Sequence, residues 1–280
     1  MMMKKVLTVF VLLFMVCFLG SCGSKVEGVI EEGKLYVGIS PDYAPYEFVD
    51  LTKEGMDKYV GSDVALAKKI ADELGLELVL KPMAFDLILT ALDTGKIDVA
   101  ISGFTWSSER ADGYLFSSPY FDDGEGDQIL VFNAKDKDNF KSLDDLNKPE
   151  VKVAAQNGSL QQELVQTQLP NATAIFFEDI NNAFTALKDG QYDAIAIAGT
   201  VAGTLIEAEE NKGIVMSDFQ FEVESSALFA IFQKDNTKLA EKINPICEEV
   251  AKGQYQKWLD EADALFLSLG DNAGELVPEE

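Results

Sequence analysis

The chain has 280 residues and a formal net charge of −25, and it contains no histidine. The strong negative charge argues against nucleic acid as a partner, because phosphate binding needs a basic surface. The absence of histidine removes Ser-His and Cys-His nucleophile pairs and most zinc sites, so neither a metal nor a cofactor is expected. The length suits either one large domain or two lobes.

The first segment has the order of a secretory signal. Lys4 and Lys5 precede an apolar run at 6–19, and small residues then lead to a cysteine in Leu19-Gly20-Ser21-Cys22. This ending resembles the bacterial lipobox, which implies that residues 1–21 are removed and that Cys22 is acylated, for example by palmitate. A diacylated cysteine carries the two hydrocarbon chains that stable membrane anchoring requires. The alternative is an ordinary signal cleaved nearby, with Cys22 incidental.

Strand and helix patterns alternate after a polar tether at 22–33. Each predicted helix has an apolar face with helical spacing and ends at a glycine, Gly75 or Gly95. Such alternation predicts βαβ units and mostly parallel sheets flanked by helices. The predicted strands are 35–39, 76–80 and 97–101, and the predicted helices between them are 64–74 and 85–92.

A short pattern occurs twice, 95 residues apart. Ala91-Leu92-x-x-Gly95-x-x-Asp98 is matched by Ala186-Leu187-x-x-Gly190-x-x-Asp193. Each copy combines a helix end, a glycine cap and the entry to a buried strand, which favours two similarly built lobes. The alternative is one common loop solution used twice in a single sheet. Ligands bind beyond the carboxyl ends of strands in open α/β sheets, so the loops at 102–105 and 198–200 are predicted to face one cleft.

Three further segments have simple sequence patterns. Residues 135–149 are polar and predict a surface connection into the second lobe, and residues 238–264 predict an amphipathic helix that contains Cys247 as a small core residue. The acidic tail at 269–280 is predicted to be disordered from Gly270 onward.

Arg110 is the only arginine in the chain. Its planar guanidinium can hold a carboxylate through two parallel hydrogen bonds, which lysine cannot copy. It follows the loop at 102–105 at a predicted helix N-terminus that is capped by Ser107, where main-chain N–H groups favour anions. Gly103 allows close approach to the backbone and Thr105 adds a hydroxyl group. The alternative role for Arg110 is a surface ion pair.

Six motifs follow one another along the chain: Gly38-Ile-Ser-Pro-Asp-Tyr43-Ala-Pro-Tyr46-Glu-Phe48, Tyr59-Val-Gly61-Ser-Asp63, Gly95-Lys-Ile-Asp98, Gly103-Phe-Thr105-Trp-Ser107-Ser-Glu-Arg110, Phe116-Ser-Ser-Pro119-Tyr120 and Tyr255-Gln-Lys-Trp258. Together they resemble the amino-acid-binding family of solute receptors for ABC importers. The resemblance covers nearly the whole mature chain and implies two α/β lobes of the periplasmic-binding-protein type, joined by two crossover strands. It implies lobe 1 at 34–129 and 229–268, and lobe 2 at 130–228. The first hinge is expected near 128–132.

The resemblance also implies residue roles. Arg110, Thr105 and the Gly103 backbone correspond to the site for a ligand α-carboxylate. Tyr43 and Phe85 correspond to the walls around the ligand side chain, although Tyr43 could serve packing alone and Phe85 could belong to the core. The second lobe's contribution on closure is implied at two further positions, Gln156 and Ser159.

One position departs from the family. Ala198 stands where the family usually has an aspartate that pairs with the ligand's α-ammonium. Three interpretations remain open: another acid from the run at 122–127 meets the ammonium, the ligand lacks that charge, or the chain has become a dehydratase for prephenate-like acids. Ser40, where receptors for cationic or amide side chains often have aspartate, makes a basic ligand less favoured.

The leading hypothesis is a monomeric, lipid-anchored, extracytoplasmic binding protein that delivers an amino acid or related carboxylate to an ABC transporter permease. The alternative is an enzyme of the cyclohexadienyl or prephenate dehydratase type on the same scaffold, which the absence of histidine disfavours. A sensory ectodomain is disfavoured because no signalling domain follows.

Overall fold

The computed structural model describes residues 26–122, 128–208 and 211–274. The predicted signal segment and Cys22 lie outside these ranges. Within them, no helix has both the length and the apolar character needed to cross a bilayer.

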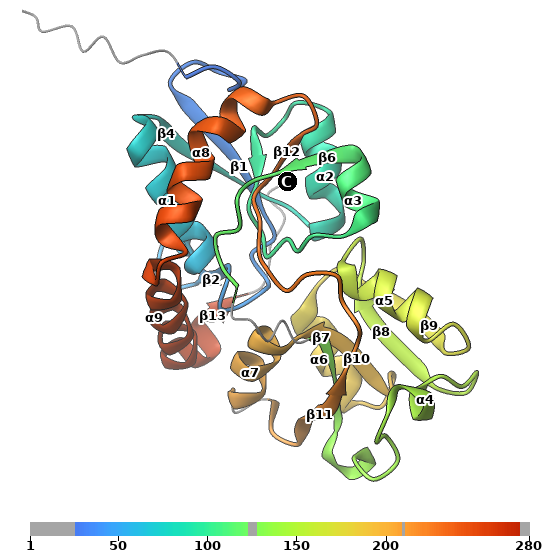
Figure 1. Ribbon diagram of the computed structural model, residues 1–280. Coiled ribbons are helices and arrows are strands. Elements are labelled where there is room, and N and C mark those ends of the chain that lie inside the picture. The colour runs from blue at the N-terminus through green and yellow to red at the C-terminus, as the bar shows by residue number, and fades with distance from the viewer. Residues whose placement is uncertain (1–25, 123–127, 209–210, 275–280) are drawn as a thin grey trace, which may run out of the picture.

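Two five-stranded sheets organise the described chain into two lobes, which Figure 1 shows one above the other. The first sheet has the order β4-β1-β5-β12-β6 and the second the order β11-β7-β10-β8-β9. A third, smaller sheet, β13-β2-β3, lies beside the first. The strands are β1 (Lys34–Ile39), β2 (Phe48–Asp50), β3 (Tyr59–Val60), β4 (Glu77–Pro82), β5 (Val99–Ala100), β6 (Tyr114–Phe116), β7 (Gln128–Asn133), β8 (Lys152–Gln156), β9 (Thr173–Phe177), β10 (Ala194–Ala198), β11 (Ile214–Gln220), β12 (Ile231–Gln233) and β13 (Ala273–Gly274).

Each large sheet is mixed in the same way. In the first, β1 pairs in parallel with β4 and β5, whereas β12 is antiparallel to β5 and β6. In the second, β8 pairs in parallel with β9 and β10, whereas β7 is antiparallel to β10 and β11. One strand therefore runs against the other four in each sheet. The predicted two-lobed α/β fold with mostly parallel sheets is confirmed.

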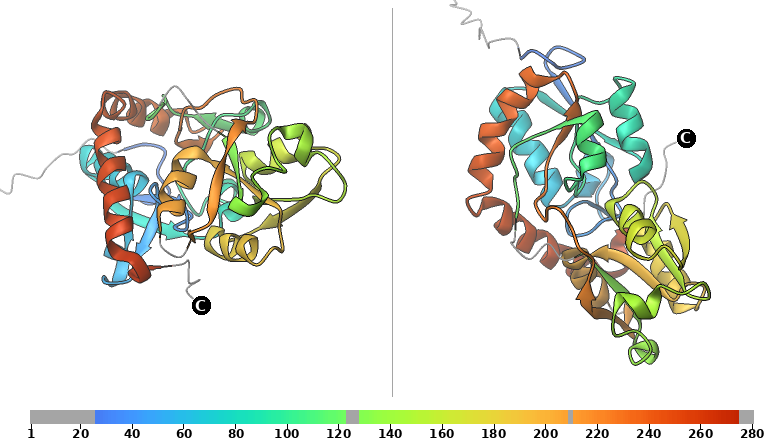
Figure 2. Two further views of the ribbon diagram at one scale, coloured as in Figure 1. Left: turned by 90° about the horizontal axis from the view of Figure 1, so that it is seen from below. Right: turned by 45° about the vertical axis from the view of Figure 1, so that its right-hand side comes forward.

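Helices cover both sheets (Figures 1 and 2), as the βαβ connections require. Buried apolar side chains fill the interior of each lobe, and the central strand β10 is an almost fully buried Ala-Ile alternation. Cys247 is fully buried in this interior, and its burial raises the pKa of its thiol to about 12. The helices are α1 (Ser62–Leu74), α2 (Phe85–Asp93), α3 (Ser108–Gly113), α4 (Leu143–Leu146), α5 (Leu160–Gln168), α6 (Ile180–Lys188), α7 (Gly199–Glu207), α8 (Thr237–Val250) and α9 (Gln254–Leu269).

The repeated pattern marks equivalent positions in the two lobes. The carboxylate of Asp98 accepts a hydrogen bond from the N–H of Tyr36 at 2.8 Å, and that of Asp193 accepts one from Lys152 at 2.8 Å. The two glycines preceding them, Gly95 and Gly190, have φ angles of 66° and 73°. Each copy thus ties a helix end to a neighbouring strand of its own sheet, so the single-sheet alternative is wrong.

Two chain segments cross between the lobes side by side, in green and orange in Figure 1. The N–H of Tyr120 donates to the carbonyl of Leu228 at 3.0 Å, and the N–H of Leu228 donates to Phe121 at 2.8 Å. The expectation of a hinge near 128–132 is wrong, because this apolar run forms β7 between β11 and β10. Residues 135–149 do not connect the lobes either, since they lie between β7 and β8 of the second sheet.

The C-terminal region differs from the sequence prediction in two ways. The single helix expected at 238–264 is two helices, α8 and α9, because Gly253 adopts a φ of 113° that ends the helical path. Residues 270–274 are ordered: β13 pairs with β2, with Ala273 opposite Asp50. Backbone pairing with an edge strand overcomes their weak hydrophobicity, and residues 275–280 lie outside the described ranges.

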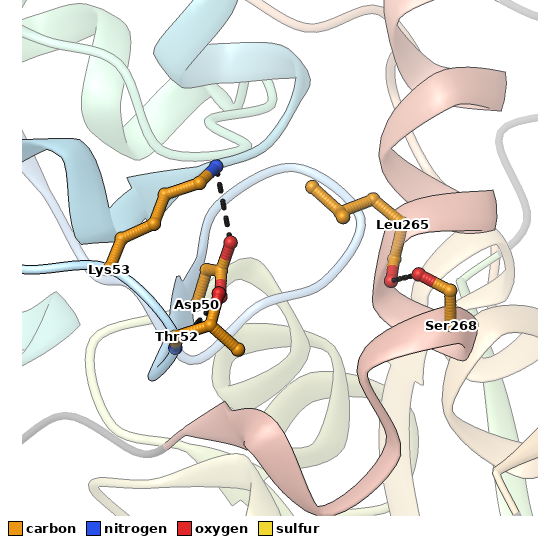
Figure 3. Close-up of polar contacts among 5 residues, drawn as sticks. All are labelled: Asp50, Thr52, Lys53, Leu265 and Ser268. Atoms are coloured by element: carbon orange, nitrogen blue, oxygen red, sulfur yellow. Dashed lines mark hydrogen bonds and ion pairs between the residues drawn. The ribbon is translucent and has the colours of Figure 1, made fainter.

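The turn after β2 lies beside the C-terminal half of α9 (Figure 3). The Asp50 carboxylate accepts hydrogen bonds from the N–H and hydroxyl of Thr52 at 3.0 and 2.5 Å and pairs with Lys53 at 3.1 Å. On α9, the Ser268 hydroxyl donates to the Leu265 carbonyl at 2.8 Å. The turn is joined to the segment before β13 by the N–H of Leu51, which donates to the carbonyl of Asn272 at 2.9 Å.

A glycine is required where α1 begins. Gly61 has a φ of 128°, and a Cβ added there would lie 2.1 Å from the carbonyl oxygen of Tyr46. This contact fixes the turn at 43–47, which is tied to α1 by the bond from the Asp63 N–H to Tyr46 at 2.9 Å. Gly75 also has a positive φ, 66°, but faces open space.

We predict that Gly61→Ala lowers the free energy of unfolding far more than Gly75→Ala. The control should cost about 1–2 kcal/mol for a left-handed alanine, whereas Gly61→Ala adds a backbone collision that must displace the turn. Chemical denaturation of both variants measures the difference. Equal losses would show that the Gly61 contact is not a constraint.

Candidate functional site

A cleft lies between the two lobes and encloses about 580 Å³ of empty space, part of it open to solvent. All seven ligand-binding residues predicted from the sequence line it, which brings together loops from both sheets. The lining residues are Tyr43, Tyr46, Phe85, Ser102, Gly103, Thr105, Arg110, Phe121, Gln128, Gln156, Ser159, Leu160, Gln161, Ala198, Gly199, Thr200, Ser226 and Leu228.

Arg110 reaches across the cleft from the first lobe to the second. It starts from α3, whose N-terminus is capped by the Ser107 hydroxyl, as the sequence predicts. Nη1 donates to the carbonyl of Thr105 at 3.1 Å and Nη2 donates to the carbonyl of Gly158, in the second lobe, at 3.1 Å. Burial lowers the pKa of the guanidinium to about 10, so it remains a cation at neutral pH. Three of its five N–H donors are left for a ligand.

Aromatic rings form the wall beside this cation. Phe85 stacks on Phe104 with ring centroids 4.7 Å apart, and the Arg110 guanidinium lies 5.4 Å above the Phe104 ring. Phe85 therefore packs against the apolar core and also lines the cleft, and its role as a wall around a ligand stays a prediction. Tyr43 lies opposite, and its hydroxyl accepts a hydrogen bond from the N–H of Ala198 in the second lobe at 3.3 Å.

The loop at 102–105 presents a different backbone group from the one expected. The N–H of Gly103 donates to the carboxylate of Asp63 at 2.7 Å, on the core side of the loop. It is therefore not available to a ligand carboxylate, and what Gly103 can offer is its carbonyl oxygen, an acceptor. A φ of 58° makes this turn of the backbone possible at a glycine.

In the second lobe, Ser159 begins α5. Its hydroxyl accepts from the N–H of Gln162 at 3.1 Å and donates to the carbonyl of Gln156 at 2.6 Å. The side chain of Gln156 donates to Asp42 of the first lobe at 3.1 Å. Both predicted second-lobe residues thus lie at the closed interface, with their own polar groups largely engaged.

Sequence reasoning missed Asp42 as a link between the lobes. Its Oδ2 accepts hydrogen bonds from Gln156 and from the N–H of Ile180, the first residue of α6, each at 3.1 Å. Its Oδ1 accepts from Ser40 at 2.8 Å, and Ser40 is buried behind the turn and does not line the cleft. The position of Asp42, between a strand end and the aromatic Tyr43, was the only sequence signal for it.

Two glutamines of the cleft were also missed. Gln161, one residue into the first turn of α5, donates to Gln128 at the start of β7 at 2.5 Å and to the Tyr43 hydroxyl at 3.5 Å. Together with Gln156 they give the second lobe a neutral, hydrogen-bonding lining. Their amides lacked any motif that would single them out among this chain's polar residues.

The charge of the cleft differs from what the family resemblance implies. Arg110 is the only charged side chain among the described residues that line the cleft. Ala198 occupies the end of β10, where the resemblance implies an aspartate. Of the acidic run at 122–127, Asp122 accepts a hydrogen bond from Ser226, a lining residue, at 2.9 Å. Residues 123–127 lie outside the described ranges, so a role for them stays a prediction.

The pH dependence of lobe closure follows from Asp42. Burial at the interface, together with the charge of Asp179, raises its pKa to about 7. Opening the cleft would expose the carboxyl and return its pKa toward about 3.9. The closed state thus binds more protons between these values, so closure is favoured as pH falls and weakens as pH rises toward 7.

We predict that ligand affinity decreases from about pH 5 to about pH 7, by at most about tenfold per pH unit. Asp42→Asn should flatten this dependence, whereas Asp86→Asn, which removes the charge of the acceptor in the 2.7 Å interlobe bond from Asn157, should preserve it. Calorimetric titration at several pH values measures both. An Asp42→Asn variant with the unchanged pH profile would contradict the assignment.

Comparison with known proteins shows the family to which the chain belongs. Its residues 35–261 match the family "Bacterial extracellular solute-binding proteins, family 3". It is 33% identical to the arginine-binding extracellular protein ArtP of Bacillus subtilis over 262 residues, which cover 91% of this chain and 96% of that protein. Cyclohexadienyl dehydratase of Pseudomonas aeruginosa is 28% identical over 170 residues, 61% of each chain.

A solved structure agrees. The amino acid ABC transporter substrate-binding protein AbpA of Streptococcus pneumoniae, bound to L-arginine, superposes with a TM-score of 0.75 at 34% identity and covers 83% of this chain and 95% of that one. Sequence, fold and the position of the cleft lead to one assignment. The chain belongs to family 3 of the bacterial extracellular solute-binding proteins.

Proposed function

We propose that this chain is the extracytoplasmic receptor of an ABC importer and that it captures an amino acid or related small carboxylate between its lobes. The observation that carries the proposal is the Arg110 guanidinium, which lies in the interlobe cleft with main-chain carbonyls as its hydrogen-bond partners among the described residues. Arg110 is half-buried and has no carboxylate in hydrogen-bonding contact among the residues that the structure describes, and partial removal of such a cation from water is costly. A ligand carboxylate would offset that cost.

The other predicted residues take roles around this cation. Thr105 completes the carboxylate site, and the Gly103 carbonyl accepts from an ammonium group instead of contributing its N–H. Tyr43 and Phe85 form the walls, and Gln156 and Ser159 complete the cleft when the second lobe closes. Because closure brings these groups together, ligand shifts the population toward the closed state, which docks on the permease.

The lining also limits the ligand. Relatives such as ArtP are named for arginine, but the described lining residues of this chain offer no carboxylate to a cationic side chain. Glutamine amides and the Tyr43 hydroxyl suit a neutral side chain that forms hydrogen bonds. We therefore propose an uncharged amino-acid side chain or a simple carboxylate as the ligand class.

A membrane anchor completes the proposal. Residues 1–21 act as the signal, Cys22 is acylated, and residues 22–33 lead into lobe 1 of a monomeric receptor. The lipobox-like sequence before Cys22 supports this part.

The prediction of a tether over all of 22–33 is wrong for its described part, because Gly28 and Ile30 are hydrogen-bonded to lobe 1. The predicted bounds of lobe 1, 34–129 and 229–268, and of lobe 2, 130–228, are kept with two changes. Strand β7 belongs to lobe 2 from Gln128 onward, and β13 in the predicted tail at 269–280 pairs with β2 of lobe 1.

The second candidate is a dehydratase, favoured by the relative from Pseudomonas aeruginosa and by the missing acid at Ala198. Both functions use the same cleft and an arginine for a carboxylate. They differ in what happens to the compound, since an enzyme converts it and a receptor returns it unchanged.

A thermal-shift screen over amino acids and prephenate-type acids separates the two. A tight receptor ligand at a thousandfold excess over its dissociation constant adds about 4 kcal/mol of stability, and chromatography should recover it unaltered. Conversion of an added acid would support the dehydratase instead. No stabilisation by any member of the panel would contradict the receptor proposal.

We predict that Arg110→Lys weakens binding of the best ligand from this screen by about ten- to a hundredfold, since losing one charged hydrogen bond costs about 1.5–3 kcal/mol. Lysine keeps the charge but not the fork. Glu109→Gln, at the exposed neighbouring position, is the matched control and should bind normally. An unaltered affinity in Arg110→Lys would reject the carboxylate role.

We also predict that Cys22→Ala moves the protein from the membrane fraction to the soluble fraction and abolishes incorporation of a labelled fatty acid, because the anchor needs the thiol. Cys247→Ala, at the buried cysteine, is the control and should remain in the membrane. A membrane-bound Cys22→Ala variant would contradict the lipid anchor.

A further inference from the structure

Two carboxyl groups lie buried together behind the cleft wall. Glu47, in the turn after Tyr43, and Asp63, on α1, are both fully buried. Oε1 of Glu47 accepts a hydrogen bond from the Ser102 hydroxyl at 2.6 Å. Oε2 of Glu47 is buried and receives none from any residue that the structure describes. A buried oxygen without a partner costs about 1–3 kcal/mol, so it requires an explanation.

Asp63 has the opposite surroundings. Its carboxylate accepts hydrogen bonds from the Gly103 N–H at 2.7 Å, the Tyr120 hydroxyl at 3.0 Å and the Tyr255 hydroxyl at 2.5 Å. A carboxylate offers about four lone-pair sites. Three donors therefore stabilise the negative charge of Asp63 and leave room for one more.

One interaction explains both the unpaired Oε2 of Glu47 and the remaining acceptor site of Asp63. The two carboxyl groups interact directly, and two ionised carboxylates cannot form a hydrogen bond because neither has a proton. We propose that Glu47 is a neutral carboxylic acid that positions the cleft wall, donating its proton to Asp63 through Oε2 and accepting from Ser102 through Oε1. Asp63 holds the single negative charge of the pair.

The electrostatic surroundings agree. The titratable groups of the described residues that interact with the pair carry no positive charge. They are Asp42 and Tyr43 from the same turn, Tyr120 from the crossing segment, Cys247 on α8 and Tyr255 on α9. Burial, followed by the charge of Asp63, raises the pKa of Glu47 well above its usual range. Burial raises the pKa of Asp63 only to about 6, because its three donors oppose the shift.

The pair holds two adjacent residues of the wall. Ser102 donates to Glu47 and accepts from the N–H of Ser40 at 3.0 Å, while the neighbouring Gly103 donates to Asp63. Each acid thus fixes one residue, and the Gly103 N–H is held toward the core. The positioning role rests on the proposed function of the cleft, whereas the protonation of Glu47 does not.

The test compares Glu47→Gln, Glu47→Ala and the exposed control Glu54→Gln in thermal unfolding of the ligand-free mature chain. Glutamine reproduces the neutral acid, with an N–H for Asp63 and a carbonyl for Ser102. In the wild type, a raised folded pKa gives stability that is lost as pH rises above about 4.3. The midpoint of Glu47→Gln should therefore equal the wild type below about pH 4 and exceed it increasingly toward pH 8.

Glu47→Ala should unfold at a lower temperature than Glu47→Gln at every pH, and Glu54→Gln should follow the wild type. The infrared carbonyl band of a protonated acid at neutral pH should be present in the wild type and lost in Glu47→Gln. A pH-independent difference between Glu47→Gln and the wild type, or the absence of that band, would overturn the proposal.

Ligand binding supplies the positioning readout. Glu47→Gln should keep the affinity of the wild type for the best compound of the amino-acid screen, and Glu47→Ala should lose at least about tenfold, or 1.4 kcal/mol. Equal losses in both variants would overturn the positioning role. A screen without any ligand would count against the proposed function alone, because the unfolding and infrared results do not depend on it.

Discussion

The structure depends on one cation placed in a gap between two lobes. Arg110 crosses from the helix end of the first lobe to the Gly158 carbonyl of the second and lies over the Phe104 ring. Removing a guanidinium from water is costly unless hydrogen bonds and charge compensate. Main-chain carbonyls supply part of that compensation, and we propose that the carboxylate of a ligand supplies the rest.

The fold surrounds this cation with neutral groups from both lobes, and none of the described lining residues is acidic. Strand ends of both sheets meet at the cleft, and the acids of the first lobe are turned to structural tasks: Asp42 links the lobes, and Asp63 holds Gly103. A chain with a net charge of −25 thus keeps its described cleft lining almost free of negative charge. Its acidic residues lie on the surface and in the interior of the lobes instead.

Much of this arrangement could be predicted from the sequence, because the informative residues are rare or repeated. A single arginine has few plausible roles, and the octet ending in Asp98 and Asp193 marks a βαβ unit twice. The errors arise where tertiary contacts decide. Gly253 interrupts a continuous amphipathic pattern, and β13 forms because β2 offers an edge. Neither the inward Gly103 N–H nor the interlobe position of Asp42 has a local sequence signature.

The account is tested most directly by a crystal structure of the mature chain with its best-binding amino acid. We expect the ligand carboxylate within hydrogen-bonding distance of the Arg110 guanidinium, between Thr105 and α5, with both lobes in contact with the ligand. A ligand bound elsewhere, or a guanidinium that faces solvent while the cleft is occupied, would contradict the central claim.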